Sequence, residues 1–227
     1  MTPIKPSLKP SKSSKVNRAW LHNHLNDPYV KLAQRDGYRA RAAYKLQQID
    51  ETLHLIKPGQ LVVDLGAAPG AWSQYARRKL SSLSLAEAAN KAPPGEVIAL
   101  DLLPMAPLAG VVFVQGDFRD SLVLAQLTQA MAGRLADVVL SDMAPNLSGI
   151  SAADAARVEE LVELALAFAQ THMKPQGALV AKVFQGRAYE PLVQRFGQVF
   201  RRVKRIKPKA SRDQSAETFL IGLGLLA

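Results

Sequence analysis

The stretch "LVVDLGAAPGAW", residues 61–72, decides the fold of this chain. Its first half is a short apolar run of the kind that forms a buried strand. Gly66 and Gly70 then mark a tight loop, and a helical pattern follows from about Gly70. A strand, a glycine-containing loop and a helix in this order predict the first unit of a doubly wound α/β domain, whose ligands bind at the carboxyl ends of the strands.

The rest of the chain repeats this alternation of apolar strands and helices. We expect helices over 121–131, 151–173 and 188–197, and strands over 96–103, 111–117, 136–143 and 177–184. Near-continuous apolar strands that alternate with helices predict a largely parallel sheet covered on both faces. Two last strands, within 200–208 and 217–226, have no helix between them. One of these two strands is therefore expected to be antiparallel.

The domain organisation is simple. With 48% hydrophobic residues in 227, the chain suits a single domain, which we place at 19–227. Residues 1–18 are rich in Lys, Ser and Pro and read as a disordered basic tail. Residues 19–50 form a basic helical extension, and 81–95 look like a surface insertion.

Composition excludes several classes of function. The chain has no cysteine, which rules out disulfides, thiolate metal sites and a cysteine nucleophile. Its apolar runs are too short to span a membrane, and its first residues lack the apolar core of a secretory signal. A cytoplasmic enzyme is the default expectation.

The net charge of +10 is concentrated in two segments. Residues 1–48 carry ten Lys or Arg against two Asp, and 201–212 carry seven Lys or Arg and no acid. The remainder of the chain is therefore acidic. This distribution is typical of a protein that binds a polyanion such as nucleic acid.

Three successive strands end in the glycine loop, in Asp101 and in Asp117. Asp64 precedes the loop, Asp101 ends the second strand, and Asp117 ends the third. The loop also lacks the full G-x-G-x-x-G spacing that serves a pyrophosphate. An acid after the second strand suits ribose hydroxyls, and one after the third can accept from an adenine amino group. The pattern favours S-adenosylmethionine over a nicotinamide nucleotide.

The fourth and fifth strands carry the chemistry. The fourth ends in "LSDMAPN", 140–146, which lacks the Pro-Pro-aromatic sequence of enzymes that methylate base amines. Without cysteine, a covalent route to base carbon is also excluded. An oxygen nucleophile is left. The fifth strand places Lys182 inside "GALVAKVFQG", 177–186, where an unpaired lysine is rarely tolerated, so we interpret it as a base held by a partner.

Seven segments resemble the FtsJ/RlmE family, and they occur in the same order from about Trp20 to the end of the chain. They are "RARAAYKL", "VVDLGAAPGAWSQY", "ALDLLPM", "VQGDFRD", "LSDMAPNLSG", "KVFQG" and "SRDQSAETFLIG". The resemblance implies a seven-stranded Rossmann-like methyltransferase fold. It also implies 2′-O-methylation of a uridine in the A loop of large-subunit ribosomal RNA.

The resemblance also implies the site. It assigns a catalytic tetrad to Lys45, Asp142, Lys182 and Glu217, in which the strand lysine accepts the proton of the ribose hydroxyl. The implied contacts with S-adenosylmethionine are Gly70, Trp72, Asp101, Asp117 and Asp142. Ala71 stands where relatives commonly have glycine, which is a small change.

Several alternatives stay open at this point. The expected partner is ribosomal RNA, within the assembled large subunit, bound by a monomer that needs no metal or membrane. A related 2′-O-methyltransferase would act on transfer RNA or an mRNA cap, and a non-catalytic relative would serve ribosome assembly. Trp20 and Tyr29 are candidates for stacking on unpaired bases, with packing in the core as the alternative reading.

Overall fold

A computed structural model of the chain describes residues 26–81, 95–145 and 151–226. Its helices are α2 (Pro28–Arg35), α3 (Ala43–Leu53), α4 (Ala71–Ser81), α6 (Ser121–Ala130), α7 (Ser151–His172) and α8 (Tyr189–Val199). Its strands are β1 (Leu61–Leu65), β2 (Glu96–Asp101), β3 (Val111–Gln115), β4 (Ala136–Ser141), β5 (Met173–Phe184), β6 (Phe200–Ile206) and β7 (Glu217–Leu225). The alternation predicted from the sequence is confirmed.

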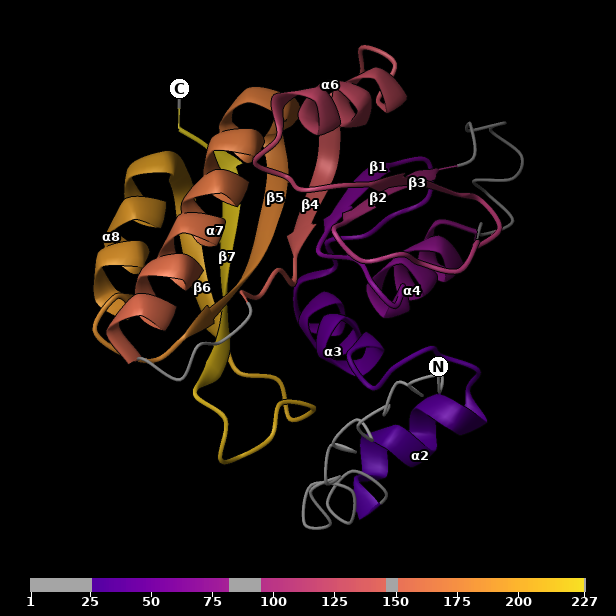
Figure 1. Cartoon of the computed structure of the whole chain (residues 1–227), viewed down its shortest axis with the longest axis horizontal. Helices are drawn as coiled ribbons and strands as arrows, with labels where there is room; N and C mark the ends of the chain where they lie inside the picture. The colour runs from indigo at the N-terminus through magenta and orange to yellow at the C-terminus, as the bar shows by residue number, and fades with distance from the viewer. Residues whose placement is uncertain (1–25, 82–94, 146–150, 227) are drawn as a thin grey trace, which may run out of the picture.

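The strands form one seven-stranded sheet in the order β3-β2-β1-β4-β5-β7-β6 (Figure 1). All neighbouring pairs are parallel except those of β7, which runs antiparallel to both β5 and β6. The strand order reverses at β1, since β2 and β3 lie on one side of it and β4 on the other. In such sheets a crevice opens at the carboxyl ends of the strands beside the reversal, and ligands bind there.

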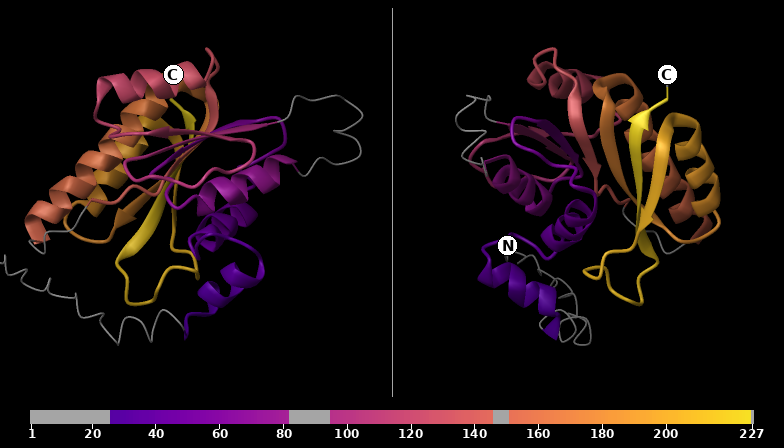
Figure 2. Two further views of the ribbon diagram at one scale, coloured as in Figure 1. Left: turned by 45° about the vertical axis from the view of Figure 1, so that its right-hand side comes forward. Right: turned by 180° about the vertical axis from the view of Figure 1, so that it is seen from behind.

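Helices cover both faces of the sheet, as expected. One core cluster joins α6, α7 and α8 to one face, with Leu127, Leu166 and Phe196 fully buried. A second cluster joins α3 and α4 to the other face, through residues such as Leu46, Trp72 and Phe219. Figure 2 shows α3 and α4 across the sheet from α6 and α7.

The described part of the basic extension contains two helices, α2 and α3. Asp27 caps α2 by accepting from the amide of Tyr29, and α2 ends at Arg35. Gly37 then adopts φ +68°, a conformation that would break any helix here. A second helix, α3, begins at Ala43. The Tyr44 hydroxyl donates to Asp36, which fixes the bend between the two helices.

Some expectations fall outside the described residues. These are the tail 1–18, Trp20, and 82–94 of the proposed insertion. Tyr29 is half-buried, packs 5.6 Å from the ring of Tyr44 and accepts from Gln48, so it belongs to a packed cluster. Within the described ranges, no helix has both the length and the apolar character needed to cross a bilayer.

The α8 face offers a direct test of the packing. Phe196 is completely buried, and its ring centre lies 5.5 Å from that of Phe200. Phe196→Ala should lower the free energy of unfolding by about 3–5 kcal/mol, because the cavity cannot fully collapse. Leu122→Ala, at a position that is 72% exposed, is the control and should change it by less than about 0.5 kcal/mol. Chemical denaturation measures both, and equal effects would contradict this packing.

Candidate active site at the carboxyl edge of the sheet

The predicted site residues gather where β1, β2, β4 and β5 end and β7 begins. Asp142 follows the last residue of β4, and Lys182 lies near the end of β5. Glu217 is the first residue of β7, which runs the other way and so starts at this same edge. Lys45 comes from the first turn of α3. The sheet and α3 thus bring together four residues that are far apart in the sequence.

Lys182 is paired, as its burial requires. Only 9% of its surface is exposed. Its Nζ lies 2.8 Å from Asp142 Oδ1 and donates to the Asp142 main-chain carbonyl at 2.7 Å. Because β4 and β5 are parallel neighbours, they end side by side, and this adjacency delivers the carboxylate to the ammonium group. The expectation that Lys182 has a partner is confirmed.

Lys45 and Glu217 form a second pair. Lys45 Nζ donates to Glu217 Oε2 at 2.7 Å, and the Ser211 hydroxyl donates to Glu217 Oε1 at the same distance. Burial by itself would raise the pKa of Glu217, but Lys45, Ser211 and the nearby Lys182 together hold that pKa below its ordinary value. Glu217 is therefore ionised at neutral pH and acts as a fixed anion.

Strand register explains why the two pairs meet. Lys182 lies opposite Phe219 and Phe184 opposite Glu217 in the antiparallel pairing of β5 with β7. Directly opposed residues share a face, as do residues two apart along a strand. Lys182 and Glu217 are thus diagonal neighbours on the face that carries α3, the helix that supplies Lys45.

The glycine loop is held from several directions. Gly66 has φ +78°, and a Cβ there would lie 2.7 Å from the main-chain nitrogen of Met143, so only glycine lets the loop approach the segment after β4. Asp101 Oδ2 accepts from the Ala68 amide at 2.8 Å. Arg39 donates to the carbonyls of Pro69 and Ala106. The loop that precedes α4 is therefore preorganised.

Three carboxylates surround this loop and give the site its charge. Asp64 is fully buried, and only its Oδ2 has a donor, the Ser73 hydroxyl at 2.6 Å. Burial, with Asp142 and Asp101 close by, raises the pKa of Asp64 to about 7. Asp64 Oδ1 is buried and accepts no hydrogen bond among the described residues, whereas the buried Asp142 Oδ1 faces the Lys182 ammonium group. Such a set of acids suits a positively charged ligand.

Asp117 and Trp72 lie differently from the other predicted cofactor contacts. Asp117 is partly exposed, and the side-chain hydrogen bonds from Arg119 lower its pKa to about 2. The Trp72 side chain is 2% exposed, donates to the Ala42 carbonyl and packs 5.7 Å from Phe219. Trp72 can therefore reach a ligand through its main chain, while its indole joins α4 to α3 and β7.

Two residues of the site carried no role in the sequence interpretation. Ser211 holds Glu217, and Arg39 spans the glycine loop and the segment after β2. Both residues occur inside the motifs "SRDQSAETFLIG" and "RARAAYKL". The motifs therefore indicated the segments that contain them, but not the contacts that their side chains make.

Most basic residues of the N-terminal extension have partners within the protein. Arg35 pairs with Asp36, and Arg41 pairs with Asp27 and donates to the Ala210 carbonyl. Burial lowers the pKa of Arg41. These contacts fasten α2 and α3 to the 207–216 loop beside Glu217. Part of the positive charge of this segment is therefore used in contacts within the protein that hold the site together, and is not available to a binding partner.

The described ranges contain no group of three or more His, Asp or Glu arranged to hold a metal ion. The carboxylates of the site are instead paired with lysines or placed around the glycine loop. The chemistry open to this arrangement is the binding of a cation and the handling of a proton at Lys182.

Comparisons with known proteins agree with this geometry. The model of FtsJ-like methyltransferases matches residues 38–225. A ribosomal RNA large subunit methyltransferase E from Albidiferax ferrireducens is 71% identical, over 95% of this chain and 97% of that protein. One from Variovorax paradoxus is 64% identical over 96% of both. A crystal structure of a Plasmodium falciparum ribosomal RNA methyltransferase superposes with a TM-score of 0.70 at 25% identity, covering 84% of this chain and all of that one.

The raised pKa of Asp64 makes stability depend on pH in a specific way. The folded protein holds the proton of Asp64 up to about pH 7, whereas the unfolded chain releases it near pH 4. Stability from the protonated form is therefore complete below about pH 4 and is lost as pH rises through 7. Asp64→Asn cannot ionise, so it should gain about 1–3 kcal/mol relative to wild type between pH 5 and pH 8.

The Tm of thermal unfolding, measured for wild type and Asp64→Asn at pH 5 and at pH 8, tests this prediction. Asp120→Asn is the control, because Asp120 is an exposed cap of α6 and asparagine caps a helix equally well. It should follow the wild-type pH dependence. An Asp64→Asn protein whose Tm changes with pH as in wild type would show that Asp64 is not the titrating group.

Proposed function

Since the chain belongs to the FtsJ-like methyltransferase family, we propose that it methylates a ribose 2′-hydroxyl of large-subunit ribosomal RNA. The observation that carries the proposal is the pairing at the carboxyl edge, with Lys182 against Asp142 and Lys45 against Glu217. The two bacterial relatives reported above are named for the same class of RNA, and their matches span nearly the whole chain.

The acidic loop supports S-adenosylmethionine as the cofactor. When bound, this group supplies a methyl on a positively charged sulfonium, and it also carries an ammonium group. Asp64 has a buried oxygen, Oδ1, that accepts no hydrogen bond among the described residues and can face such charges. Asp101 and Asp117 stand at the ends of the next two strands, where we assign them to the ribose and the adenine. Gly70 keeps the amino end of α4 open to a carboxylate.

Lys182 is the residue that we assign to the proton of the ribose hydroxyl. It is the buried amine of the site, and Asp142 holds its Nζ from two directions, through a carboxylate oxygen and a carbonyl. Glu217 does not compete for this role, because its lowered pKa makes the carboxylate a weak proton acceptor and its two oxygens already accept from Lys45 and Ser211. Lys45 and Glu217 therefore position the ribose or support the Lys182–Asp142 pair.

Two variants of Lys182 test the assignment. Lys182→Ala removes the amine and should lower kcat by about 10²–10⁴-fold, the usual contribution of a general base. Lys182→Arg keeps the positive charge but cannot release a proton, so it should be similarly impaired. Both should bind S-adenosylmethionine as wild type does, measured by calorimetry. Near-normal turnover in either variant would remove Lys182 as the base.

The acceptor is tested with a panel of RNAs. Labelled S-adenosylmethionine is incubated with wild-type protein and undermethylated large ribosomal subunits, free large-subunit RNA or transfer RNA. We expect the label in large-subunit RNA, with the assembled subunit as the better acceptor. Label in transfer RNA alone would replace the proposed substrate, and transfer to free RNA at the same rate would remove the preference for the subunit.

A further inference from the structure

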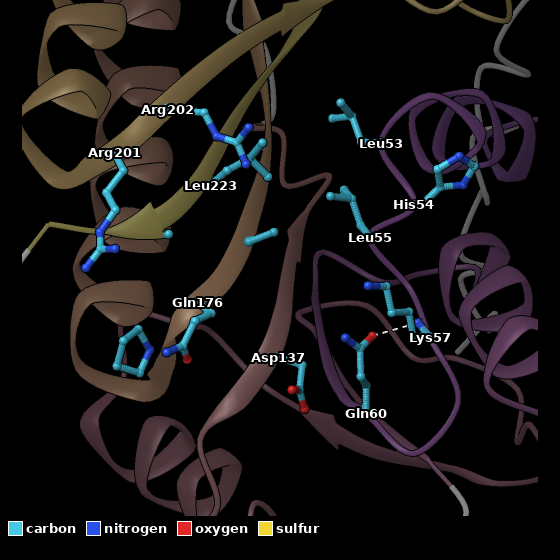
Figure 3. A pocket seen from close by; sticks show the side chains of 13 residues that line it. Leu53, His54, Leu55, Lys57, Gln60, Asp137, Gln176, Arg201, Arg202 and Leu223 are labelled. Carbon is cyan, nitrogen blue, oxygen red and sulfur yellow. Dashed lines mark hydrogen bonds between the residues drawn. The ribbon is translucent and has the colours of Figure 1, made fainter. Parts of the chain in front are cut away.

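A cavity of about 390 Å³ opens at the opposite edge of the sheet from the candidate active site. We call it the amino-edge cavity. Figure 3 shows Leu53 of α3 on one side, with His54 and Lys57 of the segment that follows this helix. Arg201, Arg202 and Leu223 of β6 and β7 lie on the other side. Asp137 and Gln176, at the beginnings of β4 and β5, lie between them.

The cavity is separate from the candidate active site. Asp137 lines it at the second residue of β4, whereas Asp142 follows the end of the same strand. Five residues of strand span roughly 17 Å. A group held in the amino-edge cavity is therefore too far away to contact the glycine loop, and the two sites can be occupied together.

The charge around the cavity is positive. Lys57 comes from the α3–β1 connection, and Arg201 and Arg202 are the second and third residues of β6. The one acid among the lining residues, Asp137, is neutralised by Lys174 at 2.7 Å and accepts from the Leu61 amide. Among the described residues, the side chains of Lys57 and Arg202 form no hydrogen bond or ion pair, so their charges are available to an anion.

The rest of the lining suits a nucleotide. Leu53, Leu55 and Leu223 give an apolar surface on which a flat base can lie, and the amides of Gln60 and Gln176 can donate to and accept from its edge. Cations for a phosphate beside an apolar wall with a few amides are the features of a pocket for an unpaired nucleotide.

A basic stripe leads from this cavity towards the candidate active site. In the β6–β7 pairing, Arg202 lies opposite Leu223 and Lys204 opposite Ile221. Opposed residues share a face, and Leu223 and Ile221 pack into the cluster that contains α3. Arg202 and Lys204 are both exposed on that face. From Arg202 to Ile206, which lies beside Phe219 near the candidate site, the strand covers roughly 13 Å.

We propose that the amino-edge cavity is a second RNA-contact site, which holds a phosphate and its unpaired nucleotide while the target ribose is at the carboxyl edge. This inference takes ribosomal RNA as the substrate from the proposed function. Arg202 and Lys57 bind the phosphate from opposite walls, and Lys204 contacts the strand between the two sites. The enzyme then binds its RNA at both the amino edge and the carboxyl edge of the sheet.

Charge reversal in the cavity tests this proposal by direct binding. Arg202→Glu and Lys57→Glu should each weaken binding of undermethylated large-subunit RNA by about tenfold near 150 mM salt, measured by filter binding without cofactor. Each should also make the dependence of log K on log salt less steep by about 0.7–0.9, the value of one phosphate contact. In methyl transfer, KM should rise and kcat at saturation should stay as in wild type.

Arg195→Glu is the matched control, because it makes the same substitution at an exposed residue of α8, on the other face of the sheet. Equal RNA affinities of Arg202→Glu and Arg195→Glu would overturn the cavity as an RNA site. Because binding is measured without turnover, the result is independent of the chemistry at Lys182. A wild-type protein that binds the RNA but transfers no methyl would contradict the proposed function alone.

A photo-crosslinking amino acid in place of Leu53 identifies the occupant. The expected product joins the protein to ribosomal RNA at a nucleotide other than the methylated one. Crosslinks to a ribosomal protein alone, obtained with assembled subunits, would show that the cavity receives a protein partner and would overturn the RNA assignment. Crosslinks at the methylated nucleotide would also contradict the proposal, because they would show that the cavity and the candidate active site hold the same nucleotide.

Discussion

Lys182 and Asp142 lie 2.8 Å apart within the molecule, and the geometry around them depends on keeping that pair together. An ammonium group with 9% exposure is costly unless an anion compensates it. The compensation comes from β4, the parallel neighbour of β5, which ends beside it. Neither residue would meet the other if the strand order or the register were different.

The second pair depends on the one antiparallel strand of the sheet. Because β7 starts where β5 ends, Glu217 arrives beside Lys182, and α3 places Lys45 over it. The four residues form two ion pairs of balanced formal charge. Around them the charges separate. Asp64 and Asp101 lie beside the glycine loop, whereas Arg202 and Lys204 lie along β6 towards the opposite edge. We infer that a cationic cofactor and a polyanionic substrate are attracted to different parts of one domain.

The sequence allowed most of the fold to be predicted, and it named residues that the structure brings together at the carboxyl edge of the sheet. Apolar strand periodicity identified the strands, and their carboxyl ends located Asp101, Asp142 and Lys182. The pairings required the structure, since only the position of α3 over the sheet and the adjacency of β4 and β5 show that Glu217 meets Lys45 while Asp142 meets Lys182. Composition also does not show which of the basic residues are available to bind RNA. Arg39 and Arg41 look like RNA ligands in the sequence, yet their side chains hold main-chain carbonyls of other segments. Free cations such as Arg202 become recognisable only when the contacts of each side chain are known.

The position of the transferred methyl group tests the central claim most directly. Alkali cleaves RNA through the 2′-hydroxyl, so a 2′-O-methyl ribose protects the adjoining phosphodiester bond. Labelled large-subunit RNA is hydrolysed with alkali and its products are separated by size and charge. We predict that the label is found in an alkali-resistant dinucleotide. Label in a mononucleotide, and hence on a base, would contradict the assignment of Lys182 and Asp142 to a ribose hydroxyl.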